Sequence, residues 1–229
     1  MLRNGGKMTT FFSKQNKLGL IVGLIFILGA LAYANTWNTP FQFDDRGHIL
    51  QNPNIREISK AWHASQNSRL LPNLSAAFNF FLGKTNVIGY HLFNFGVHAL
   101  NALWVYFLIS LLLITPKMLG KYSEKTVYFL ATFSALVFLV HPLQIQAVTY
   151  IIQRMTSMAA FFYLGAVVFY LKGRLDEKWS YNVAGILMAI AAMYCKENAF
   201  TLPLAIVLVE ALFFGFAGGK RKAFLRLHP

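Results

Sequence analysis

Two adjacent carboxylates, Asp44 and Asp45, lie in the segment FQFDDRGHILQNPNI, directly after the first long apolar run. They are notable because the 229-residue chain has only eight Asp and Glu residues in total. A carboxylate near a membrane surface can take a proton from a hydroxyl nucleophile or bind a divalent metal ion. Asp is also a common residue at turns and helix N-termini, so a structural role is the alternative. His48 is a candidate partner, with the same alternative.

Two cations, Arg154 and Lys196, each border a hydrophobic run, where an unpaired cation is costly. At a membrane boundary an Arg can hold a phosphate group with two parallel hydrogen bonds, and a Lys can act as a point charge. Alternatively, both side chains extend to the interface, and Glu197 neutralises Lys196. The residues leave these alternatives open.

Further polar residues interrupt the apolar sequence at two places. His141 precedes Pro142, which predicts a helix end, because a residue before proline avoids the helical conformation. Gln144 and Gln146 then lie near the membrane boundary, either as exposed hydrogen-bonding groups or as part of a polar turn. Glu210, inside LAIVLVEALFF, is expected to pair with the basic residues that follow it and is left out of the predicted site.

The composition indicates a membrane protein. Hydrophobic residues make up 56% of the chain and charged residues 13%, against about 25% charged residues in soluble domains. The net charge of +13 comes from short basic clusters between apolar runs, an arrangement that favours anionic lipid headgroups over nucleic acid. With a single cysteine, Cys195, the chain can form no disulfide within itself.

Apolar runs of about 20 residues are long enough to cross a bilayer as helices, and six segments approach that length. The predicted fold is therefore all-α, a polytopic membrane protein with about six transmembrane helices. The first span is interpreted as a retained signal anchor, with a cleaved signal peptide as the alternative. The six segments are Leu18–Tyr33, Tyr90–Ile114, Thr126–Val140, Met155–Leu171, Trp179–Tyr194 and Ala199–Phe216.

The positions of Lys and Arg predict a cytoplasmic N-terminus, because basic residues concentrate in short cytoplasmic loops. These residues are Arg3, Lys7, Lys14 and Lys17, then Lys117, Lys121 and Lys125, then Lys172, Arg174 and Lys178, and finally Lys220, Arg221, Lys222 and Arg226. This topology brings three polar segments to the opposite, non-cytoplasmic face, as a shared site requires. They are the Asp44/Asp45 loop, His141–Arg154 and Cys195–Phe200.

The long loop at 36–89 is expected to have structure of its own. The stretches IREISKAWHAS and LPNLSAAFNFFLGK carry apolar residues at helical spacing, which predicts short helices lying against the membrane surface. Trp37 and Trp62 suit such a boundary. A structured loop of this length is often functional.

Four segments, in this order, resemble a known family. FQFDDRGHILQNPNI is similar to the first-loop motif of the TMTC-like, tetratricopeptide-repeat-associated glycosyltransferases of the GT-C superfamily. Two later segments of the same family are similar to RLLPNLSAAFNFFLGKTNVIGYHLFNFGVHALNALWVY and CKENAFTLPLAIVLVE. A third resembles HPLQIQAVTYIIQRMTSMAAFFYLGAVVFYL, which has a form typical of bacterial members. Phosphate-loop, dinucleotide and serine-hydrolase motifs are absent from the sequence.

The resemblance implies a GT-C-like fold and an enzyme that takes a sugar from a polyprenyl-phosphate carrier. The sugar would be placed on a Ser or Thr hydroxyl of an acceptor protein at the extracytoplasmic face, in a bacterial inner membrane. Asp44 or Asp45 would act as the catalytic carboxylate, with a divalent metal ion as a possible aid. Arg154 and Lys196 would hold the phosphate leaving group.

The resemblance also indicates which residues line the pocket for the lipid-linked sugar. His91, Asn94 and His98 share one helical face at spacings of three and four, and a polar contact between helices explains that spacing equally well. The full expected lining consists of His48, Arg69, His91, Asn94, His98, His141, Gln144, Gln146 and Glu197.

GT-C enzymes usually have more than six spans, and this family continues into helical repeats. The sequence is thus expected to be the N-terminal part of a longer protein. It divides into a cytoplasmic tail at 1–17, a transmembrane module at 18–216 and a basic cytoplasmic tail at 217–229. The alternatives to an active enzyme are a non-catalytic membrane scaffold, a transporter-like bundle or an inactive truncated enzyme.

Overall fold

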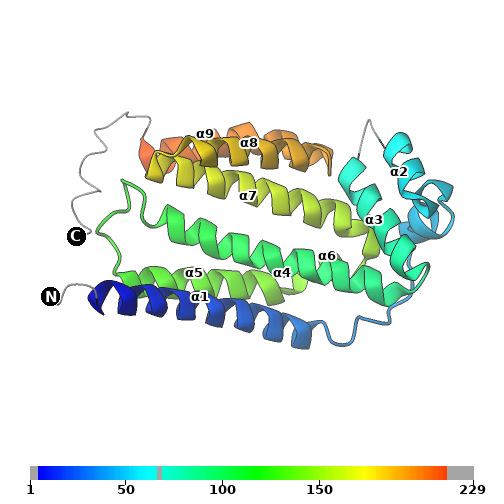
Figure 1. Cartoon of the computed structure of the whole chain (residues 1–229), viewed down its shortest axis with the longest axis horizontal. Helices are drawn as coiled ribbons and strands as arrows, with labels where there is room; N and C mark the ends of the chain where they lie inside the picture. The colour runs from blue at the N-terminus through cyan, green and yellow to red at the C-terminus, as the bar shows by residue number, and fades with distance from the viewer. Residues whose placement is uncertain (1–4, 66–68, 216–229) are drawn as a thin grey trace.

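A computed structural model describes residues 5–65 and 69–215, and in these ranges the chain forms helices and no strand. Six helical segments run alternately up and down and form an elongated bundle (Figure 1). The all-α prediction is confirmed. The bundle consists of α1 (Gly5–Ala32), α4 (Val87–Leu112), α5 (Glu124–Val140), α7 (Arg154–Asp176), α8 (Trp179–Met193), and α9 (Leu202–Val209) with its continuation η6 (Glu210–Phe214).

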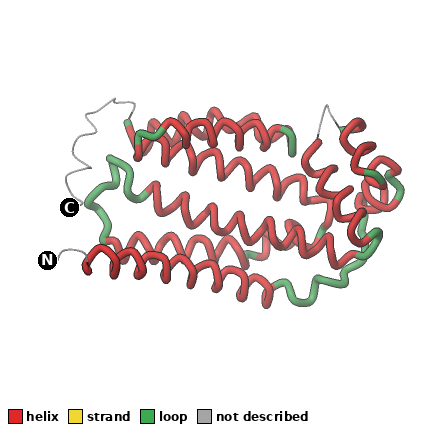
Figure 2. The backbone as a smooth tube through the Cα atoms, in the orientation of Figure 1, coloured by secondary structure: helices red, strands yellow, loops and turns green. Residues whose placement is uncertain are grey.

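The bundle is capped at one end by short helices, at the right in Figure 1. The loop at 36–89 supplies four of them: η1 (Arg46–Leu50), η2 (Pro53–Arg56), α2 (Ile58–Ala64) and α3 (Leu70–Gly83). Helical spacing predicted α2 and α3, whereas η1 and η2 were not predicted. A second group lies between α5 and α7, where Figure 2 shows short helical pieces joined by loops. These pieces are η3 (Pro142–Gln144), α6 (Ile145–Thr149) and η4 (Ile151–Gln153).

All six predicted spans are helical, but they differ in length and hydropathy. Three helical stretches are long and apolar enough to cross a membrane alone: Val87–Leu112, Ile151–Asp176 and Glu197–Phe214. A fourth candidate is Glu124–Val140 taken together with Pro142–Thr149, although the two parts are bent by 54°. The apolar stretches Leu18–Ala32 and Trp179–Met193 are shorter than a typical span.

Local sequence explains where several helices begin and end. The side chains of Asn86 and Ser123 accept hydrogen bonds from the first turns of α4 and α5, as helix N-caps do. His141 adopts an extended conformation before Pro142 and ends α5, as the His-Pro pair predicted.

Small residues allow the helices to pack closely. Ala99 and Ala102 of α4 lie with Ala135 of α5 in one buried cluster. At the contact between α7 and α8, a β-carbon built on Gly173 would lie only 2.0 Å from the side-chain oxygen of Asn182. A larger residue at 173 would therefore require the exposed Asn182 side chain to move.

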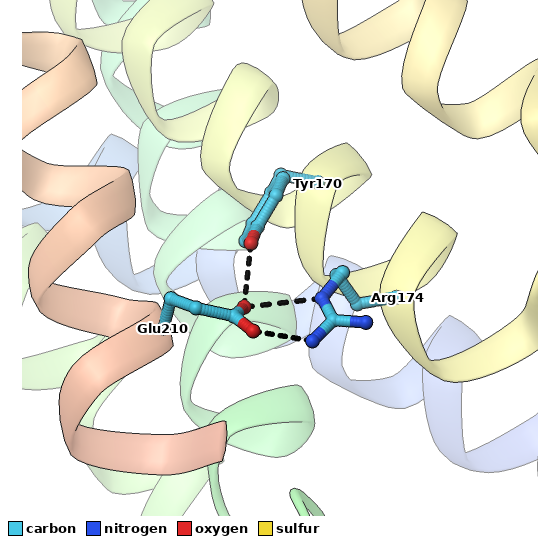
Figure 3. Close-up of polar contacts among 3 residues, drawn as sticks. All are labelled: Tyr170, Arg174 and Glu210. Atoms are coloured by element: carbon cyan, nitrogen blue, oxygen red, sulfur yellow. Dashed lines mark hydrogen bonds and ion pairs between the residues drawn. The ribbon is translucent and has the colours of Figure 1, made fainter. Parts of the chain in front are cut away.

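The end of the bundle that faces away from the short helices is closed by a polar cluster (Figure 3). Arg174 of α7 binds both carboxylate oxygens of Glu210, one of them at 3.0 Å from Nε, and the Tyr170 hydroxyl donates to the same carboxylate at 2.6 Å. Glu210 thus pairs with α7, where the sequence predicted pairing with the basic tail. The tail at 217–229 lies outside the described residues, and within 1–17 the described part, from residue 5, continues α1 as helix.

Candidate functional site

The three predicted polar segments meet at the capped end of the bundle. The Asp44/Asp45 loop is hydrogen-bonded to the segment between α6 and η4. At the start of α7, Thr156 accepts a hydrogen bond from Lys196, which follows α8. Because α4, α5, α7 and α8 are antiparallel, segments distant in sequence end at the same face (Figure 1).

Asp45 has a buried carboxylate that is engaged on both oxygens. It is 1% exposed, and its oxygens accept the backbone N–H groups of Gln42 at 3.1 Å and Ile152 at 2.8 Å. Burial raises the pKa of Asp45, while the backbone donors and the charge of His91 act in the opposite direction. Asp45 therefore links the first loop to the segment before α7, which is the structural role that sequence left open.

Asp44, in contrast, is exposed. Its backbone N–H donates to the hydroxyl of Tyr150 at 3.2 Å, and the Asp44 side chain also interacts with that hydroxyl. The preceding residue, Phe43, has φ of +40° and is 81% exposed, an unusual backbone conformation for an aromatic residue. The pair therefore consists of one accessible carboxylate and one structural carboxylate.

A shallow hollow of about 450 Å³ lies beside this carboxylate pair. It is lined by Pro40, Phe41, Gln42, Phe43 and Arg46, all from the first loop. Its wall is mostly apolar, with the exposed Arg46 as its charged side chain. The hollow is open and adjoins Asp44 in the sequence through Phe43.

Arg154 is the largest buried polar side chain and is only 1% exposed. Its guanidinium group donates to Asn79 at 2.9 Å and to Ser75 at 3.3 Å, both on α3. The same group lies over the rings of Tyr90 and Phe93 on α4. Arg154 joins three helices at the capped end and carries a positive charge that no carboxylate contacts within the described ranges.

Lys196 is half-buried, and its ammonium group donates to the Thr156 hydroxyl at 2.8 Å. The neighbouring Glu197 is exposed and lies 3.5 Å from Arg69 across the same end of the bundle. Lys196 is therefore held against α7. Glu197 forms its ion pair with Arg69 and not with Lys196.

The polar residues of α4 are fully buried and face backbone carbonyl groups. The two ring nitrogens of His91 lie 2.8 Å from Thr39 O and 3.2 Å from Val148 O. Asn94 donates to Ile151 O at 3.2 Å, and His98 lies 3.0 Å from Leu139 O. These contacts agree with one of the two interpretations of the three-and-four spacing, a polar contact between packed segments. None of the three side chains lines the hollow at 40–46.

The remaining predicted residues lie near the break between α5 and α7 or in η1. His141 accepts the N–H of Leu143 through Nδ1 and so caps the short helix η3. Gln144 is half-buried and Gln146 exposed, while His48 is exposed in η1. These residues border the site region without contacting Asp44.

The described residues do not form an evident metal site. No group of three or more His, Cys, Asp or Glu side chains is arranged to hold a metal ion there. Both Asp45 oxygens already accept backbone N–H groups, and this carboxylate is buried, whereas Asp44 is exposed, so the two carboxylates differ in their accessibility to a metal ion. The predicted metal dependence stays a prediction, and no chemical step below depends on it.

Several residues of this region were not identified from the sequence. Tyr150, Ser75, Asn79 and Thr156 contact the predicted residues. Asn101 continues the α4 pattern three positions after His98 and donates to Ser157 O at 2.9 Å. The three-and-four spacing could have identified Asn101; the other contacts depend on which helices pack together.

Comparison with known proteins finds relatives along most of the chain. The protein O-mannosyl-transferase Tmtc1 of Drosophila melanogaster is 28% identical over 222 residues, which cover 90% of this chain and 24% of the relative. The mouse protein O-mannosyl-transferase TMTC3 is 26% identical over 86% of the chain and 21% of its own length. A Caenorhabditis elegans protein O-mannosyl-transferase, F38B6.6, is also 26% identical, over 80% of the chain and 27% of its own length.

The chain therefore spans about a quarter of the length of these relatives. No family model and no solved structure matches it. The matches cover the carboxylate loop and the later polar segments together, and they confirm the resemblance that these segments indicated.

Proposed function

We propose that this chain, a homologue of the TMTC protein O-mannosyl-transferases, is the membrane part of a glycosyltransferase that modifies protein hydroxyl groups. The observation that carries the proposal is the different state of the two adjacent carboxylates. Asp44 is exposed beside an open hollow, whereas Asp45 is buried and holds the loop in place. A general base needs such an accessible carboxylate on a fixed backbone.

In the proposed reaction, Asp44 takes the proton from a Ser or Thr hydroxyl of the acceptor protein. The hydroxyl oxygen forms a bond to the anomeric carbon of the sugar, and the bond between that carbon and the carrier phosphate breaks. The phosphate leaves with the electron pair of the broken bond. Positive charge near the departing oxygen stabilises the transition state, in which negative charge develops on the phosphate.

Lys196 is the residue we assign to the phosphate. It is half-buried at the same end of the bundle as Asp44, and its ammonium group has one hydrogen bond, to Thr156. An ammonium group has three donors, so it can also bind a phosphate oxygen. Arg154 is buried against α3 and α4, and we assign it a contribution of positive potential without direct contact.

We further propose a polyprenyl-phosphate sugar as the donor and the extracytoplasmic side as the site of transfer. Basic residues support this orientation. The connections between α4 and α5 and between α7 and α8 carry Lys117, Lys121 and Lys178, and both connections lie at the end away from the carboxylates (Figure 1). Short basic loops remain on the cytoplasmic side. The bacterial inner membrane and the following helical repeats remain predictions.

The test is transfer to an acceptor protein in cells that carry the full-length gene with single substitutions. Asp44→Asn removes the base while preserving the shape of the side chain. We expect transfer to fall by about a hundredfold or more, since general bases contribute about 10²- to 10⁴-fold. The measurement is the mass of the intact acceptor, together with the amount of enzyme in the membrane.

Glu57→Gln is the matched control. Glu57 is an exposed carboxylate in the same loop and pairs with Lys60, so its loss should leave transfer unchanged. Transfer at the wild-type level by the Asp44→Asn enzyme would exclude Asp44 as the base. Absence of transfer by the wild-type protein itself would favour a non-catalytic membrane scaffold.

A further inference from the structure

We propose that Tyr150 is a positioning residue that fixes the Asp44 carboxylate for proton transfer. This inference rests on the proposed function, because it gives Tyr150 a role only if Asp44 is the base. Tyr150 lies between α6 and η4 in an extended conformation, at the point where the chain turns toward α7. It contacts the first loop from a segment more than 100 residues away in sequence.

Tyr150 contacts Asp44 through both the backbone and the side chain. The Tyr150 hydroxyl oxygen accepts the Asp44 N–H at 3.2 Å, and the hydroxyl also interacts with the Asp44 carboxylate. An O–H group can accept one hydrogen bond and donate another at the same time. One hydroxyl can therefore fix the backbone of Asp44 and limit the rotation of its side chain.

The ring of Tyr150 supports the residue before the carboxylate. Phe43 packs edge-on against it, with ring centroids 6.1 Å apart and planes at 80°. Because Phe43 is mostly exposed and has a positive φ, burial of its own side chain cannot hold this conformation. Hydrogen bonds within the loop, from Asp45 N–H to Gln42 O and from Arg46 N–H to Phe43 O, hold its turn. The Tyr150 ring and the Asp45 link to Ile152 anchor the loop on either side of Asp44 to the segment before α7.

The protonation of Tyr150 agrees with a donor role. Burial and the side chains of Asp44 and Asp45 raise the pKa of the Tyr150 hydroxyl above its usual value of 10.0. The hydrogen bond from the Asp44 N–H has the opposite effect but does not cancel this increase. The hydroxyl is thus protonated at neutral pH and cannot serve as the base. The Tyr150 hydroxyl therefore acts on Asp44, and Asp44 takes the proton from the hydroxyl group of the acceptor protein.

The experiment compares Tyr150→Phe with the wild type in the full-length enzyme. The substitution retains the ring contact with Phe43 and removes only the hydroxyl. We expect kcat to fall by about tenfold to a hundredfold with KM for donor and acceptor unchanged, because a small displacement of a reacting group costs up to about 10²-fold. A role in folding or substrate binding would change the amount of enzyme or KM instead.

Two further enzymes make the test specific. The double variant of Asp44→Asn with Tyr150→Phe should be no slower than Asp44→Asn alone, since Tyr150 acts through Asp44. Tyr122→Phe, at the opposite end of the bundle and 44% exposed, removes a hydroxyl far from the site and should have no effect.

Wild-type kcat in Tyr150→Phe would overturn the inference while leaving the proposed function intact, provided that Asp44→Asn is inactive. An additive loss in the double variant would also overturn it. If Asp44→Asn retains full activity, the assignment of Asp44 as the base fails, and the positioning role fails with it.

Discussion

At Asp45, each carboxylate oxygen accepts a backbone N–H from a different part of the chain, Gln42 before it and Ile152 after α6. An amide in its place has one acceptor oxygen, so one of the two N–H groups must lose its partner. The loop that carries Asp44 is thus held by its buried neighbour.

Asp45→Asn is therefore expected to destabilise the protein. The loss of one partner for a buried N–H costs about 1–3 kcal/mol in the free energy of unfolding. The measurement is thermal unfolding of the purified protein in detergent, with Asp44→Asn as the control at the neighbouring, exposed position. Equal stability of the two variants would contradict the structural role of Asp45.

Sequence alone identified the residues of this region better than their roles. The carboxylate pair and Lys196 are visible from their rarity and their position beside apolar runs. The division of roles within the Asp44–Asp45 pair depends on Gln42 and Ile152, and the partners of Arg154 depend on the docking of α3 against α7. Such contacts join residues about 75 or more positions apart, and local spacing carries no information about them.

Among the helices, α7 and the last helical segment are joined by a polar cluster in addition to their apolar contacts. The side chains of Arg174 and Glu210 are 20% and 18% exposed, and Tyr170 donates to the same carboxylate. The sequence predicted the helices themselves from their apolar length. It did not identify Arg174 and Tyr170 as partners of Glu210, because α7 and η6 become neighbours only when the bundle forms. Pairing of Glu210 with the basic tail stays a prediction.

Glu210→Gln should loosen this end of the bundle. Loss of one partner from a buried ion pair costs about 3–5 kcal/mol; since this pair is partly exposed, we expect about 1–3 kcal/mol. The measurement is thermal unfolding in detergent. Lys172→Gln is the control on the same helix, because it removes an exposed pair with Asp176 that contributes about 0–1 kcal/mol. A Glu210→Gln protein as stable as Lys172→Gln would contradict the role of this cluster.

Over the whole molecule, the two ends of the bundle differ in character. One end has the accessible carboxylate and half-buried Lys196, and the other has an ion pair and basic connections between helices. The topology predicted from Lys and Arg placed the polar segments together, and the antiparallel order of the helices brings them to one end (Figure 1). The number of membrane spans is less well determined by sequence, since α1 and α8 contain apolar stretches shorter than a full span.

Cys195, the single cysteine, provides a measure of folding for the entire bundle. It is fully buried near α7, and burial raises its pKa from 9.0 to about 12. At pH 8 the folded protein should then contain on the order of a thousandfold less thiolate than the unfolded chain. We expect a maleimide to label Cys195 quickly in denaturing detergent and very slowly in the native protein, as measured by mass. Rapid labelling of the native protein would show that this end of the bundle opens readily.

The bend after α5 has a consequence for how substitutions in this protein should be interpreted. In a continuous helix, backbone carbonyl groups accept hydrogen bonds from the helix itself. Around the break after α5, backbone carbonyl groups are instead hydrogen-bonded to the side chains of His91, Asn94 and His98. Pro142 ends α5, and side chains of a different helix hold the segment that follows the bend. A replacement in α4 that leaves α4 intact can therefore loosen a segment 57 residues away, and so move Tyr150 without any change near it.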